Sequence, residues 1–182
     1  MDIAVTGYAG YEGSRSIYAN KDYRDKLLNR YSESFFGVLK EDVYEYSSAE
    51  RKGYDALYAK MSAEELAADS GDGGVLSALW KVMKKAGCGG TYSLRDIPVM
   101  QQTIEVCEMF GLNPYRLHSP ECRVWLMEDM GALQYEAAGA RVPLRVIGFT
   151  TKGVAIKRTD TEQDSSLRRP EADELYKLFP AK

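Results

Sequence analysis

Two glycine-rich turns far apart in the chain restrict the fold more than any other feature. The first turn, residues 6–13, contains Gly7, Gly10 and Gly13, and the second turn, residues 69–74, reads Asp-Ser-Gly-Asp-Gly-Gly. Glycine adopts positive φ without steric cost and lets another backbone or a ligand come close. A glycine turn that opens a helix also directs free N–H groups toward an anion. We therefore expect both turns to be places of close contact.

The spacing of apolar residues predicts strands and helices in mixed order. Strands are expected at residues 2–6, 91–94 and 122–127, and a hairpin at residues 144–149 and 154–157. Helices are expected at residues 21–40, 48–60, 72–86, 98–110, 128–139 and 170–179. Three further segments are predicted less specifically: residues 14–19 are extended or helical, residues 61–68 continue the preceding helix or start a new one, and residues 159–169 form a loop. Asp72 is the expected N-cap of its helix, and Gly87 and Gly111 follow helices where a left-handed C-cap belongs. The mixture without strict alternation favours an α+β fold, with a mixed, largely antiparallel sheet covered by helices, over a doubly wound parallel sheet.

Composition narrows the class of protein. A chain of 182 residues fits a single domain, and its net charge of −3 with scattered Lys and Arg argues against a nucleic-acid surface. No apolar run reaches the length of a membrane span, and no secretory signal begins the chain. Three cysteines at wide spacing, Cys88, Cys107 and Cys122, form neither a disulfide framework nor a zinc signature. These features indicate reduced thiols and a cytoplasmic protein.

The second turn has two interpretations from its residues alone. The amides of Gly73 and Gly74 at a helix start can face a phosphate, with Ser70 and Gly71 leading into the same turn. Asp72 would repel a bare anion, but its carboxylate can hold a Mg²⁺ carried by a nucleotide. The other interpretation is a capped helix packed closely on a neighbouring strand, with no ligand.

No catalytic residue and no metal site can be assigned from the sequence. The first turn has the pattern Gly-x-x-Gly-x-x-Gly, which differs in spacing from a dinucleotide fingerprint. His118 is the only histidine and is interpreted as an ordinary loop residue. Ser119 and Cys122 lack the strained elbow that activates a nucleophile.

Taken in order, several segments resemble one family. They are residues 2–13 with Gly7, Gly10, Glu12 and Gly13, then Asp69-x-x-x-Gly-Gly-Val-Leu-Ser-Ala-Leu, Ile97-Pro-Val, the helix 103–110 followed by Gly-Leu-Asn-Pro, and Asp173-Glu-Leu-Tyr-Lys. This set is similar to the C-terminal domain of AIR synthase-related (PurM-like) proteins, and most of all to hydrogenase maturation factors of the HypE type. The resemblance implies ATP-dependent activation of an amide, thioamide or similar oxygen, with ATP and Mg²⁺ as the cofactor. In complete members an N-terminal domain dimerises and supplies most acidic ligands of Mg²⁺-ATP, and the C-terminal domain contributes its glycine turns to the cleft.

The chain departs from this family pattern in several places. We expect residues 1–182 to form only the C-terminal domain, without the N-terminal ATP-binding domain. The family's Asp-Pro-Thr-x-Gly-Gly is Asp-Ser-Gly-Asp-Gly-Gly here, so a threonine hydroxyl is missing, and the chain ends in Phe179-Pro-Ala-Lys without the terminal cysteine of the HypE type. Transfer of the HypE reaction to this chain does not follow.

The sequence therefore predicts a stand-alone accessory or binding module with a vestigial phosphate or nucleotide site. That site comprises Gly7, Gly10, Gly13, Ser70, Gly71, Asp72, Gly73 and Gly74. Its expected partners are a second copy of the chain or a separately encoded subunit of the N-terminal type, and not nucleic acid or a membrane. The alternative is an ATP-dependent maturation or kinase-like enzyme that such a subunit completes. A third possibility is a scaffold without any ligand.

Overall fold

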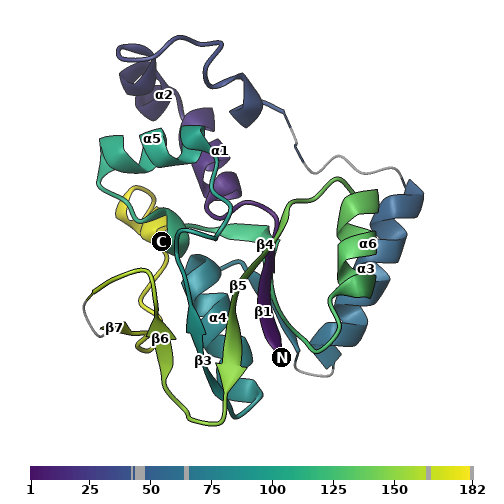
Figure 1. Cartoon of the computed structure of the whole chain (residues 1–182). Helices are drawn as coiled ribbons and strands as arrows, with labels where there is room; N and C mark the ends of the chain where they lie inside the picture. The colour runs from purple at the N-terminus through teal and green to yellow at the C-terminus, as the bar shows by residue number, and fades with distance from the viewer. Residues whose placement is uncertain (42, 44–47, 64–65, 163–164, 181–182) are drawn as a thin grey trace.

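The chain folds around one mixed sheet with helices on both faces (Figure 1). The computed structural model describes residues 1–41, 43, 48–63, 66–162 and 165–180. Within these residues the strands follow the order β2-β4-β1-β5-β3-β6-β7 across the sheet. Their bounds are β1 Asp2–Thr6, β2 Ala67–Ser70, β3 Gly89–Tyr92, β4 Ser119–Met127, β5 Leu144–Thr151, β6 Ile156–Arg158 and β7 Ser165–Ser166. The helices are α1 Tyr11–Ala19, α2 Lys21–Leu28, α3 Ser48–Ala63, α4 Gly74–Lys85, α5 Gln101–Phe110 and α6 Gly131–Gly139, with 3₁₀ turns η1 Gly37–Leu39, η2 Pro114–Arg116 and η3 Glu174–Lys177.

Strand pairing in the sheet is antiparallel except between β3 and β6. The predicted α+β class with a mixed, largely antiparallel sheet is thus confirmed. The predicted hairpin of β5 and β6 is wrong, because β3 lies between these two strands. Gly148 permits this insertion, since a Cβ there would collide with the Thr91 carbonyl of β3.

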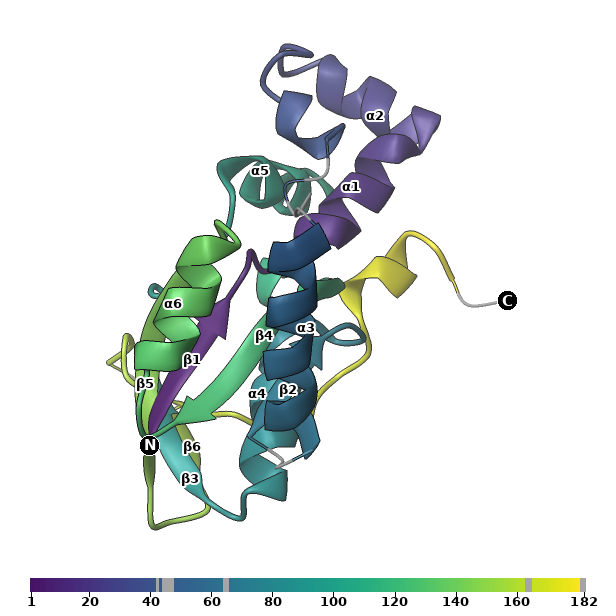
Figure 2. The same ribbon diagram turned by 90° about the vertical axis from the view of Figure 1, so that its right-hand side faces the viewer.

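Helices cover the two faces of the sheet unequally. On one face, α4 buries Val75 and Leu79 against Ile3 of β1 and Val124 of β4. On the other face, α3 and α6 lie over the half of the sheet around β1, β4 and β2, as Figure 2 shows from their side. There Tyr54 of α3 and Leu133 of α6 pack with Ala4 and Trp125. Trp125 Nε1 donates a hydrogen bond of 2.8 Å to Thr6 Oγ1, which fixes the buried indole.

A separate apolar cluster joins α1, α2 and α5 at one end of the sheet (Figure 1). The helix predicted for residues 21–40 is wrong beyond Leu28, where α2 ends. The chain then turns, and the Phe35 amide donates to Ser32 Oγ at 3.3 Å. This turn brings the fully buried Phe36 onto the Tyr18 ring of α1, with ring centroids 5.3 Å apart. Aromatic burial against α1 therefore outweighs continuation of the helical pattern.

Other predicted boundaries shift by a few residues. Helix α4 begins at Gly74 with Gly73 as its N-cap at φ 82°, so Asp72 is not the cap. Helix α5 begins at Gln101 rather than Pro98, and α6 begins at Gly131. Residues 67–70 are a strand, residues 165–166 pair with β6, and only the turn η3 forms within 170–179. The C-caps at Gly87 and Gly111 adopt the predicted left-handed conformation, both with φ 65°.

Candidate functional site

Both glycine turns leave the sheet at the same end. Strands β1 and β2 flank β4, and near the ends of the two strands Thr6 and Asp69 both pair with Arg123 of β4. The first turn then enters α1 and the second turn enters α4. The topology therefore brings the two turns close together, although about 60 residues separate them in the sequence.

His118 connects the two turns. The Gly13 amide of the first turn donates to the His118 carbonyl at 2.8 Å. On the other side, the His118 ring nitrogen Nδ1 lies 2.9 Å from the Gly71 carbonyl of the second turn. A carbonyl oxygen only accepts hydrogen bonds, so Nδ1 carries the proton. This role could not be predicted from the sequence, because both partners are distant in the chain.

The carboxylate of Asp173 occupies the start of α4. Its Oδ2 accepts the Gly73 amide at 2.9 Å, and its Oδ1 accepts the amides of His118 at 3.2 Å and Leu175 at 2.9 Å. Asp173 is only 4% exposed. A negative charge at this end of α4 is favourable because the helix dipole and the free amides point toward it. One of the two amides expected to face a phosphate, that of Gly73, thus bonds to a side chain of the same protein.

The glycines of both turns make room for the connection between α5 and β4. A Cβ on Gly74, at φ 65°, would lie 2.6 Å from the Tyr115 carbonyl, and a Cβ on Gly10, at φ 72°, would lie 2.8 Å from the Pro114 carbonyl. At Gly13 a Cβ would collide with the Leu117 side chain. Segment 114–117, which includes η2, therefore presses on both turns. Close packing within the chain is the contact that these glycines permit.

The remaining predicted site residues have separate surroundings. The Gly7 amide donates to the Pro143 carbonyl at 2.9 Å, and the Gly71 amide donates to Asp69 Oδ1 at 3.0 Å. Ser70 is fully buried on β2. Asp72 is exposed, and the negative charge of its carboxylate raises the pKa of Tyr176 in η3. The structure thus gathers Gly10, Gly13 and residues 71–74 around η2 and His118, and it places Gly7 against another loop.

A charged network beside the turns was not predicted. Arg51 of α3 donates to Glu121 at 3.0 and 3.2 Å and to Asp55 at 2.9 Å. The Arg123 side chain, 7% exposed, lies 3.8 Å from both of these carboxylates. Its guanidinium also sits over two aromatic rings, those of Tyr54 and Tyr58, at 4.9 and 3.9 Å. The Glu121 amide donates to Glu12 Oε1 at 3.2 Å, which connects this network to the first turn.

Among the described residues, nothing supports Cys122 as a nucleophile or the presence of a metal site. Burial raises the pKa of the Cys122 thiol to about 12, so this thiol is protonated at neutral pH and a poor nucleophile. In the part of the chain that the structure describes, no three His, Cys, Asp or Glu side chains gather as a metal site. No described helix has the length and apolar character needed to cross a membrane.

No family model and no curated protein matches this sequence. Solved structures do match. E. coli HypE is 18% identical with a TM-score of 0.64, over 96% of this chain and 51% of that one. Thiamine-monophosphate kinase from Stenotrophomonas maltophilia is 14% identical with a TM-score of 0.55, over 89% and 51%. T. maritima PurL complexed with FGAR is 19% identical with a TM-score of 0.50, over 97% and 27%.

These likenesses show the fold. The chain has the AIR synthase-like (PurM) fold that its sequence resembles, and it spans about half the length of the HypE chains that it matches. The coverage is consistent with the predicted correspondence to a C-terminal domain. At such low identity the activities of these proteins do not transfer to this chain.

Proposed function

We propose that this chain is an accessory or binding module with an AIR synthase-like fold, whose phosphate or nucleotide site at the second turn is vestigial. The observation that carries the proposal is the Asp173 carboxylate, which accepts the Gly73 amide at 2.9 Å and two further backbone amides. A phosphate at this position would have to displace a buried carboxylate of like charge. Asp72 beside it adds a second negative charge.

The proposal predicts weak nucleotide binding and no turnover by the chain alone. Calorimetry with Mg²⁺-ATP should give a Kd no tighter than about 1 mM, because each lost charge-assisted contact costs about tenfold or more in affinity. Asp72→Asn should change the Mg²⁺ dependence of any binding at this turn, whereas Asp22→Asn on α2 is the control. ATP hydrolysis above background by the purified chain would contradict the proposal.

A specific surface favours the alternative of an enzyme completed by another protein. Val146 and Phe149 of β5 are 45% and 58% exposed. Val146 pairs with Ala4 of β1 and Phe149 pairs with Asp2, so both side chains point to the face that carries α3 and α6. The two residues are three positions apart on β5, and the irregular pairing at Ile3 and Ala4 lets them share this face. We call these two residues the β5 patch. Neither residue belongs to the apolar cluster that α3 and α6 form with β1 and β4.

We infer that the β5 patch docks a complementary AIR synthase-like half. The chain spans about half the length of the HypE chains that it matches, and exposed apolar surface is commonly covered by a partner. The free thiols of Cys88, Cys107 and Cys122 fit a cytoplasmic setting. Such a partner would supply the acidic ligands for Mg²⁺-ATP, and the chain would then contribute to an ATP-dependent maturation or kinase-like reaction.

Light scattering after size-exclusion chromatography tests this docking. The chain should bind an added N-terminal domain of the HypE type, and Phe149→Asp should abolish binding, whereas Val154→Asp, also exposed but in the loop after β5, should not. A mass that rises with concentration would identify a second copy as the partner instead. Monomer mass at every concentration and no binding to the added domain would refute both partners. ATP hydrolysis that appears only in the mixture would favour the enzyme over the accessory module.

A further inference from the structure

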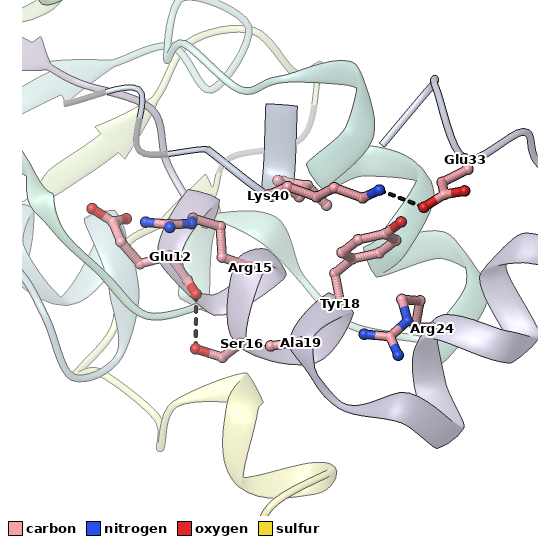
Figure 3. Close-up of a pocket in the computed structure, with 9 residues that line it drawn as sticks. Glu12, Arg15, Ser16, Tyr18, Ala19, Arg24, Glu33 and Lys40 are labelled. Carbon is pink, nitrogen blue, oxygen red and sulfur yellow. Dashed lines mark hydrogen bonds and ion pairs between the residues drawn. The ribbon is translucent and has the colours of Figure 1, made fainter. Parts of the chain in front are cut away.

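A cavity of about 650 Å³ lies between α1, α2 and the segment that contains η1 (Figure 3). Its volume falls within the range of about 300–1,000 Å³ that is typical of small-molecule sites. Arg15 and Tyr18 come from α1, Arg24 from α2, and Lys40 and Glu33 from the segment that follows α2. The break of the predicted long helix at Leu28 creates this cavity, because the chain folds back over α1.

Lys40 and Glu33 form an ion pair at the rim of the cavity. The hydrogen bond between them lowers the pKa of Glu33 and raises that of Lys40. Their side chains are 47% and 68% exposed for Lys40 and Glu33, respectively. Exposed ion pairs contribute little to stability, so an incoming anion can replace Glu33 on Lys40 at small cost.

Tyr18 brings a buried hydroxyl to the same place. The residue is 3% exposed, and among the residues that the structure describes its hydroxyl has no hydrogen-bond partner. Figure 3 shows this hydroxyl directed toward the end of the cavity where Lys40 meets Glu33. The Phe36 ring, whose centroid is 5.3 Å away, fixes the orientation of Tyr18. A buried hydroxyl without a partner is unfavourable, and an acceptor that reaches it gains affinity.

Arg24 completes the group of donors. Its guanidinium has no ion pair or side-chain hydrogen bond within the described ranges of the chain, and Figure 3 shows it beside the Tyr18 ring. Its charge still acts on Glu33, whose pKa it helps to lower. Arg24, Lys40 and Tyr18 thus offer two cations and one neutral O–H donor around one space.

We propose that this cavity binds a small molecule through a phosphate group that contacts Arg24, Lys40 and the Tyr18 hydroxyl and displaces Glu33 from Lys40. Three donors from three separate segments suit the several oxygens of a phosphate, whereas a carboxylate has only two. Arg15 and Glu12 lie at the other end of the cavity, where the rest of the ligand would extend (Figure 3). This site is separate from the second turn and does not depend on the function proposed above.

Calorimetric or NMR titration of the full chain with inorganic phosphate tests the proposal, with acetate as the comparison anion. Phosphate should bind more tightly than acetate. Arg24→Gln should weaken phosphate binding about tenfold, the loss expected for one charge-assisted contact. Tyr18→Phe should weaken it severalfold without lowering the melting temperature, because the lost hydroxyl has no partner in the protein. Glu33→Gln should strengthen binding, and Arg30→Gln on the exposed surface is the matched control.

The outcomes separate cleanly. Unchanged phosphate affinity in folded Arg24→Gln and Tyr18→Phe variants would overturn the proposal, as would no binding to the wild-type chain. Acetate binding as tight as phosphate binding would also overturn it in favour of a carboxylate site. Asp72→Asn should leave the titration unchanged, and a change there would assign the phosphate to the second turn.

Discussion

Removal of the Asp173 carboxylate should strongly destabilise the protein. Asp173 accepts three backbone amides, those of Gly73, His118 and Leu175, and it is 4% exposed. Loss of the contact to Leu175, which caps η3, costs about 1 kcal/mol. Each of the other two amides, left without an acceptor, costs about 1–2 kcal/mol. Asp173→Ala should therefore lower the free energy of unfolding by about 3–5 kcal/mol. Asp173→Asn should cost about 1–2 kcal/mol, because its oxygen still accepts while its NH₂ group faces one amide.

Urea unfolding measures these losses. With an m-value of about 2 kcal/mol/M, Asp173→Ala should lower the midpoint by about 1.5–2.5 M. Added phosphate or formate should raise the midpoint of this variant, since either anion can take the vacated place at the start of α4. Glu171→Ala is the control: its carboxylate pairs with Arg116 but is 68% exposed, so the loss should stay below about 1 kcal/mol and no anion should restore it.

A small effect would refute the reasoning. If Asp173→Ala lowers stability by less than about 0.5 kcal/mol, as an ordinary surface substitution does, the carboxylate does not satisfy these amides. The second turn would then be open to an external anion, and the proposal of a vestigial site would fail. A large loss of stability in Asp173→Ala that neither phosphate nor formate restores would confirm the structural role of Asp173. It would exclude an origin of the second turn as an anion-binding site.

Three further predictions concern other parts of the molecule. Gly74→Ala should lower the free energy of unfolding in urea by about 2–4 kcal/mol. Gly87→Ala is the control: Gly87 has the same φ of 65°, but no atom lies within 4 Å of the added Cβ, so the loss should be only about 1 kcal/mol. Equal losses would exclude close packing of η2 on Gly74. The hydrogen bond and charge of Arg158 lower the pKa of Asp160 to about 2. The ionised carboxylate therefore stabilises the folded protein by about 2 kcal/mol above pH 4, and this stabilisation is lost as pH falls from about 4 to about 2. Unfolding measured between pH 7 and pH 2.5 should show this loss in wild type but not in Asp160→Asn. Burial raises the pKa of Cys107 and Cys122 to about 12, so their thiols should react poorly. After iodoacetamide treatment at pH 8, mass spectrometry should find Cys88 modified first, and Cys107 and Cys122 modified only in denaturant. Early labelling of Cys122 would contradict its burial.

The sequence predicted elements whose signals are local. Strand β1 has the predicted bounds, and α4 lies within the predicted 72–86 because its apolar stripe and terminal glycines are all near in sequence. Gly111 could be placed at a helix end because a left-handed C-cap needs only its own φ. The α+β class followed from the order of such elements. These predictions required no knowledge of distant contacts.

The errors arise where distant contacts decide. The hairpin prediction for β5 and β6 used a good local turn, but β3 pairs with both strands from 50 or more residues away. At the site, Asp173 and Gly73 are 100 residues apart, and His118 and Gly71 are 47 apart. The sequence could therefore locate the glycines but could not say what approaches them. Both interpretations of the second turn, a ligand or close packing, used the same property of glycine.

The free energy needed to move Asp173 away from the Gly73 amide distinguishes the completed enzyme from the accessory module. For the enzyme, a docked partner or its nucleotide must move Asp173 away from Gly73, and the cost of that step is what Asp173→Ala measures. The β5 patch and Asp173 lie on different segments, so docking at the patch does not by itself open the turn. A cost of about 3–5 kcal/mol reduces nucleotide affinity by a factor of about 10²–10³·⁵ unless the partner makes contacts only in the open state. Mg²⁺-ATP affinity that rises on mixing with the partner in wild type, but is already high in Asp173→Asn, would therefore favour the enzyme, because it would show that displacement of this carboxylate limits binding.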